Sequence, residues 1–151
     1  MRLATIMVAL SASFAAHGGY FRVSTGQSNA QVQLDVNHSH YYVITPQDMS
    51  LIAGTPDFIL GGSFVMKAGS SSSNDITLRL FEALTPLPTI TGSDTVITPV
   101  GGALATRVIT FTEFCAQVSG NCQSYQTHNM DFLLAQPLDP LKTYFLQLTS
   151  P

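Results

Sequence analysis

Two histidines, His38 and His40, stand two residues apart in the stretch NHSHYY and are the nearest approach to a metal-binding pattern. If a strand continues through them, both imidazole rings lie on one face and could hold one metal ion. No third ligand is identifiable, because His17 and His128 have no fixed relation to the pair. We therefore expect two exposed polar residues at a strand end and no cofactor, and a metal site on His38 and His40 is the minor alternative.

The acidic and nucleophilic residues give no recognisable catalytic pattern. The nine acidic residues are dispersed, and several lie beside Gly, Pro, Ser or Asn, as turn residues do. Paired carboxylates of the glycosidase kind cannot be assigned from such spacing. Motifs that prepare a nucleophile, such as G-x-S-x-G, S-x-x-K and H-E-x-x-H, are absent from the sequence, and so is a phosphate-binding glycine loop. The sequence therefore predicts a protein without catalytic activity, and a small secreted hydrolase or metalloprotein centred on His38 and His40 is the weaker alternative.

The two cysteines predict a disulfide. Cys115 and Cys122 are the only cysteines and flank the turn-forming residues Ser119, Gly120 and Asn121. If two strands flank this turn, the two sulfur atoms can approach each other. Such a bond persists in an oxidising compartment, which agrees with export.

Composition excludes one class of partner. Charged residues make up only 10% of the 151-residue chain, against about 25% in a typical soluble domain, and the formal net charge is −3. The six basic residues are scattered and form no patch that could neutralise phosphates, so we expect no nucleic-acid partner. A surface that is rich in Ser and Thr and poor in charge favours an exported β-protein.

The first residues have the features of a targeting segment. Arg2 precedes a short apolar run over residues 3–10, and Ser13 and Ala15 have the spacing of a cleavage site after Ala15. We predict a signal peptide over residues 1–15 and a single domain over residues 16–151, with a buried N-terminal strand or helix as the alternative. The apolar run is too short to span a bilayer, and no other stretch is long enough.

Period-two alternation of apolar residues predicts strands through most of the chain, and helical patterns are nearly absent. In FVMKAGSSSSNDITLRLFE, both apolar flanks alternate, so we predict one hairpin with a long polar tip over residues 69–75. Further strands are predicted over residues 30–36, 41–45, 58–60, 106–114, 129–135 and 144–149. Short strands with frequent turns predict an all-β fold, an antiparallel sandwich of the Ig-like or jelly-roll kind.

The positions of several apolar side chains follow from the same alternation. Met130, Phe132 and Leu134 are predicted on one face of their strand. Tyr144, Leu146 and Leu148 are predicted to point inward from the last strand. If no further strand follows, this last strand is an exposed edge that could recruit a partner by strand addition.

Tyrosine and phenylalanine side chains offer a second kind of surface. Some of these rings could form a sugar-binding face, although most rings in a sandwich belong to the core and the chain lacks tryptophan. The rings considered are Tyr20, Phe21, Tyr41, Tyr42, Tyr125 and Tyr144.

The stretch GGSFVMKAGSSSSNDITLRLFEAL (61–84) has a glycine pair beside a strand pattern and a Ser-rich tip, and MDFLLAQPLDPLKTYFLQLTSP (130–151) follows it later in the chain. These stretches resemble exported bacterial proteins of the PEP-CTERM sorting class, and the resemblance covers about the last 90 residues. It implies a signal-bearing, non-catalytic surface or matrix protein with a C-terminal anchor. The printed chain ends without a Pro-Glu-Pro tail, so either it is a fragment truncated at its C-terminus or the protein is released.

These observations together predict a non-catalytic exported β-sandwich of the bacterial cell surface or extracellular matrix, with a structural or adhesive role. Its partners would be other surface proteins or polysaccharide. A carbohydrate-binding module, or the accessory domain of a secreted glycosidase, is the alternative.

Overall fold

The computed structural model describes residues 4–6, 20–24, 32–34, 38–46, 57–68, 74–89 and 96–150, with the backbone alone for 4–6, 24, 32–34 and 38. The elements in chain order are β1 (Ala4–Ile6), β2 (Tyr20–Ser24), β3 (Val32–Leu34), β4 (His38–Ile44), β5 (Asp57–Ala68), β6 (Ile76–Glu82), β7 (Ala105–Ile109), α1 (Phe111–Ala116), β8 (Gln126–Leu138) and β9 (Tyr144–Ser150).

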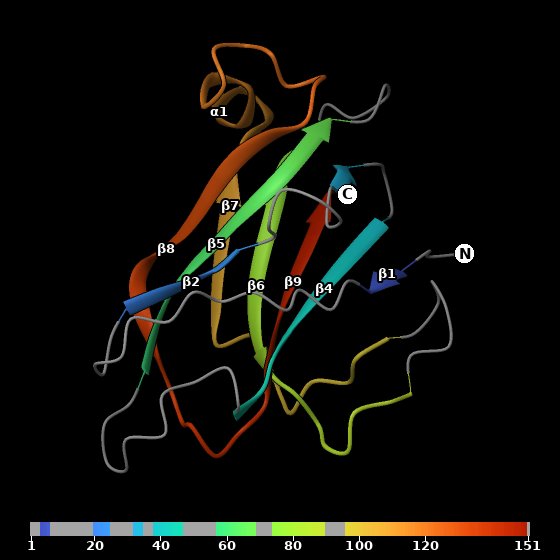
Figure 1. Cartoon of the computed structure of the whole chain (residues 1–151), viewed down its shortest axis with the longest axis vertical. Helices are drawn as coiled ribbons and strands as arrows, with labels where there is room; N and C mark the ends of the chain where they lie inside the picture. Colours follow the sequence, from blue (N-terminus) through green and yellow to red (C-terminus); the bar gives the residue numbers. More distant parts are fainter. Residues whose placement is uncertain are drawn as a thin grey trace.

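The strands form two sheets that pack face to face, as the predicted all-β sandwich requires (Figure 1). Sheet A has the order β1-β4-β9-β6-β7. Sheet B contains β5, which pairs with β8 along one edge and with β2 and β3 along the other. The β1–β4, β2–β5 and β3–β5 pairs are parallel, so the sandwich is mixed and not purely antiparallel.

The core lies between the sheets and follows the predicted alternation. Phe64 and Met66 of β5 have no exposed surface, and the same holds for Leu78 and Leu80 of β6. Every second side chain of a strand points to the same face, so these residues meet in one layer. Burial of such side chains is the main stabilising contribution to this fold.

The stretch from Phe64 to Glu82 is not a hairpin. Its two flanks are strands, as predicted, but β5 belongs to sheet B and β6 to sheet A. The polar segment between them therefore connects the two sheets. Alternation specifies which side chains point inward, and both arrangements bury the same residues.

The last strand is central and not an exposed edge, so the predicted partner edge at Tyr144, Leu146 and Leu148 is wrong. β9 pairs with β4 on one side and with β6 on the other. The inward orientation of these three side chains is confirmed, since all are buried. Their backbone groups are used within sheet A, which leaves β9 closed to strand addition along both sides.

The predicted strand over residues 106–114 ends early, at Ile109, and α1 follows. Thr110 caps the helix: its hydroxyl accepts a hydrogen bond from Glu113 N, and the Glu113 carboxylate accepts one from Thr110 N. This reciprocal pair is a capping box. The hydrogen bonds from Thr110 lower the pKa of the Glu113 carboxyl.

Replacing Thr110 with Ala is expected to lower the free energy of unfolding by about 1 kcal/mol, because one helix N–H loses its acceptor. Urea denaturation followed by circular dichroism measures this change. Thr112→Ala is the matched control, since Thr112 is an exposed residue within α1 and not its cap. Equal destabilisation by both substitutions would contradict the capping role.

Candidate functional site

The outward side of sheet B is the best candidate for a binding surface, because loop residues cover the corresponding side of sheet A. There, Tyr41 and Phe145 form a second apolar cluster with Ala83 and Ile97, against which Leu87 packs. On sheet B, by contrast, the outward side chains of β2, β5 and β8 are half-buried or exposed. We define the sheet B outer face by Tyr20, Arg22, Phe58, Lys67, Asn129 and Asp131.

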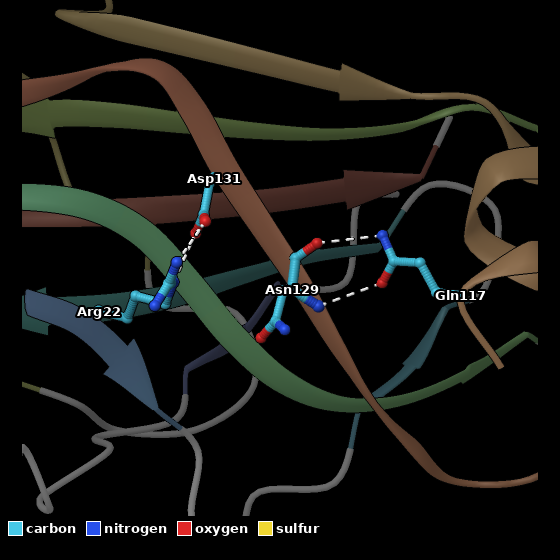
Figure 2. A network of polar contacts seen from close by, with 4 residues as sticks. All are labelled: Arg22, Gln117, Asn129 and Asp131. Atoms are coloured by element: carbon cyan, nitrogen blue, oxygen red, sulfur yellow. Dashed lines mark hydrogen bonds and ion pairs between the residues drawn. The ribbon is translucent and has the colours of Figure 1, made fainter.

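An ion pair crosses the middle of this face (Figure 2). Arg22 of β2 donates from Nε to Asp131 Oδ1 at 2.7 Å and from Nη2 to Oδ2 at 2.5 Å. The hydrogen bond to the Asp131 carboxylate raises the pKa of the Arg22 guanidinium. Both side chains are about two-fifths exposed, so the pair contributes at most about 1 kcal/mol to stability. Its main effect is to fix two charged groups in one orientation on the surface.

Because Gly61 has no side chain, Arg22 and Asp131 can form their ion pair across β5 at this position. Arg22 and Asp131 are both register partners of Gly61, on opposite sides of β5. A Cβ atom on Gly61 would lie 2.0 Å from Met130 O, and φ at this residue is +153°. Only glycine tolerates so close an approach of the neighbouring backbone.

The pairing of β5 with β8 is irregular beside Gly61. Ile59 pairs with Gln136 and Gly61 with Asp131, so Leu60 stands opposite the four residues 132–135 of β8. This bulge turns Leu134 outward to 75% exposure, while Met130 and Phe132 remain buried. The prediction that Leu134 shares their face is therefore wrong.

Aromatic rings lie at both ends of the outer face. The rings of Tyr20 and Phe58 are 5.4 Å apart and inclined by 32°, and Tyr20 is 68% exposed. At the other end, Lys67 Nζ lies 4.7 Å from the centre of the Tyr125 ring. The other tyrosines considered as sugar-binding candidates, Tyr41, Tyr42 and Tyr144, are buried.

Residues 110–122, which we call the α1–disulfide unit, border the outer face beside β8. Cys115 and Cys122 are joined by the predicted disulfide, with their Cα atoms 4.8 Å apart. The flanking geometry differs from the prediction, because Cys115 lies in α1 and not in a strand. Figure 1 shows α1 at one end of the sandwich, where Cys122 O accepts a hydrogen bond from Ala68 N at the end of β5.

Replacing both cysteines with serine is expected to lower the free energy of unfolding by about 2–3 kcal/mol, because the unfolded chain gains the freedom of an open loop. Chemical denaturation of the oxidised protein and of the variant measures the difference. Wild-type protein reduced with dithiothreitol serves as the control and should match the variant. Equal stability of the oxidised and variant proteins would contradict this prediction.

His128 lies beneath the α1–disulfide unit, on the inward side of β8. Its ring stacks on Phe114 of α1, with centroids 3.9 Å apart and planes inclined by 16°. The side chain has no exposed surface, and neither ring nitrogen has a hydrogen-bond partner among the described residues. Burial lowers the pKa of this imidazole to about 4, so the ring is neutral near pH 7.

The two predicted metal candidates are not arranged as expected. The described residues 32–34 form β3 in sheet B, whereas His38 and His40 lie in β4 of sheet A, so the two segments are separate strands. His40 is buried on the inward side of β4 and is not an exposed polar residue, whereas the side chain of His38 lies outside the described residues. Within the described part of the chain, no three His, Cys, Asp or Glu residues are placed to hold a metal ion.

Sequence reasoning missed two features of this site. Arg22 and Asp131 are 109 positions apart, and no local pattern links them. The capping box, in contrast, has a readable signature in Thr110 and Glu113, which stand three residues apart.

Comparison with family models, with curated proteins and with solved structures gives no match to this chain. The resemblance to PEP-CTERM-type proteins therefore remains a prediction. Among the described residues, no helix has the length and apolar character needed to cross a bilayer.

Proposed function

We propose that this chain is a non-catalytic, exported β-sandwich of the bacterial cell surface or extracellular matrix, with a structural or adhesive role. The observation that carries the proposal is the Cys115–Cys122 disulfide within an all-β fold. Disulfides persist in oxidising compartments and are rare in the cytosol. The low charge of the chain and the resemblance to PEP-CTERM-type proteins also support it.

The predicted signal peptide has a structural consequence. Cleavage after Ala15 would remove β1, which pairs with β4 alone among the described strands. The mature sheet A would then begin at β4 and keep β9 and β6 at its centre. The core residues described in both sheets all lie after the cleavage site, so the sandwich is expected to remain intact.

Cell fractionation tests the proposed location. We expect the protein outside the cytoplasm and accessible to protease added to intact cells. A cytoplasmic protein with both cysteines reduced would overturn the proposal.

Carbohydrate binding is the second candidate, and the exposed ring of Tyr20 favours it. Tyr20 and Phe58 lie next to the hydrogen-bonding groups of Arg22 and Asp131, on the side of the sandwich where side chains remain accessible. Sugar rings stack on aromatic rings while their hydroxyls bond to neighbouring polar groups. The inclination of the two rings means that they do not form one flat platform.

Co-sedimentation with insoluble polysaccharides, namely cellulose, chitin and peptidoglycan, tests this second candidate. We expect one of them to retain the wild type and Tyr20→Phe, and to lose most of the Tyr20→Ala protein. Val108→Ala, on β7 of the opposite sheet, is the control and should bind as the wild type does. If all variants bind equally, or if none of these polysaccharides retains the wild type, carbohydrate binding is rejected. The structural or adhesive role is then the remaining proposal.

A further inference from the structure

The outer edge of β8 is one of the strand edges that the pairing of the described strands leaves open. Among the described strands, β8 is hydrogen-bonded to β5 alone. In an antiparallel ladder, alternate residues direct their N–H and C=O groups away from the partner strand. Asn129 is such a residue, and the register places Thr127 and Asp131 in the same alternation. An edge of this kind is a template for pairing with another strand.

One side chain occupies this edge. The Gln117 amide donates from Nε2 to Asn129 O and accepts from Asn129 N through Oε1, each at 3.1 Å (Figure 2). A carboxamide carries a donor and an acceptor in one plane, as a peptide group does. Gln117 therefore makes with Asn129 the two hydrogen bonds that a residue of a neighbouring strand would make.

The position of Gln117 is fixed by the rest of the α1–disulfide unit. Gln117 is the C-cap residue of α1, directly after the short helix that contains Cys115. Gln117 lies inside the loop that the Cys115–Cys122 disulfide closes, and the Phe114–His128 stack holds the helix against β8. The disulfide and the ring stack together keep the carboxamide next to Asn129.

We propose that Gln117 is an edge-capping residue that prevents β8 from pairing with β8 of a second copy of this chain. An antiparallel pair of identical strands about a two-fold axis is self-complementary, so a second copy fits this edge without any other partner. Leu133 and Leu134 of the same strand are 88% and 75% exposed, and pairing along β8 would bring apolar surface of two copies together.

The first test compares Gln117→Ala with Gln136→Ala. Gln136 is the matched control, because its amide bonds to Leu134 O within β8 and does not contact Asn129. Hydrogen exchange measured by NMR should show the Asn129 amide exchanging at least tenfold faster in Gln117→Ala at low protein concentration. Light scattering should show its mass rising with concentration toward twice that of the wild type. An unchanged exchange rate, or an unchanged mass despite faster exchange, would overturn the proposal.

A second variant identifies the edge that is used. Thr127→Pro removes an N–H that points away from β5, so it blocks pairing at the edge and spares the β5–β8 ladder. In the double variant Gln117→Ala/Thr127→Pro, we expect the mass to return to that of the wild type. If the larger mass persists, association uses another surface and the proposal is wrong.

Discussion

Gly61→Ala is expected to destabilise the protein by about 3 kcal/mol or more, because a backbone strain and a steric overlap act together. The added Cβ would lie 2.0 Å from Met130 O and 2.8 Å from Asp131 Cα. Both contacts are with backbone atoms of β8, which cannot rotate away as a side-chain end can. The φ of +153° is a conformation that residues with a Cβ rarely adopt.

Gly102→Ala is the matched control for this substitution. A Cβ at Gly102 meets nothing within 4 Å, so we expect a change in the free energy of unfolding of less than about 0.5 kcal/mol. Urea denaturation of both variants gives the comparison. If Gly61→Ala is as stable as Gly102→Ala, then β5 and β8 do not approach each other at Gly61 as closely as described here.

Acidification is expected to destabilise the fold through His128. The pKa of the buried ring is lowered to about 4 from an ordinary value of 6.5, so the unfolded state binds the proton more tightly. Stability from this group is fully present above pH 6.5 and is lost as the pH falls toward 4. The difference of the two pKa values corresponds to a loss of about 3 kcal/mol across this range.

The His128→Phe variant isolates this contribution from that of the carboxyl groups. It keeps a ring against Phe114 and removes the titrating group. The free energy of unfolding, measured between pH 7 and pH 4, should fall about 3 kcal/mol less in the variant than in the wild type. Parallel pH profiles for the two proteins would show that the His128 ring is accessible to solvent or paired in the folded state.

The sequence predicted the inward faces of the strands well, because alternation depends only on local geometry. Phe64 and Met66, and likewise Leu146 and Leu148, lie in the core as their spacing indicates. Alternation does not specify which strands pair. For that reason the alternation is equally compatible with a hairpin of β5 and β6 and with β9 at an edge, whereas β5 and β6 lie in different sheets and β9 is central.

The residues of the candidate site cannot be predicted from local sequence patterns, because their positions depend on a bulge and on the pairing of distant strands. The bulge beside Gly61 shifts the register of β8, so it turns Leu134 outward against the simple alternation. The Arg22–Asp131 pair forms only because β2 and β8 flank the same residue of β5. Tyr20 and Phe58 meet through the same parallel pairing, which no local pattern predicts.

The proposal of an exported, disulfide-bonded sandwich is tested most directly by the intact mass of the full chain after expression with its own N-terminus in a bacterial host. We predict that the protein recovered outside the cytoplasm begins at Ala16 and has the mass of the oxidised Cys115–Cys122 pair. A protein that stays in the cytoplasm, keeps residues 1–15 and carries two free thiols would contradict the account.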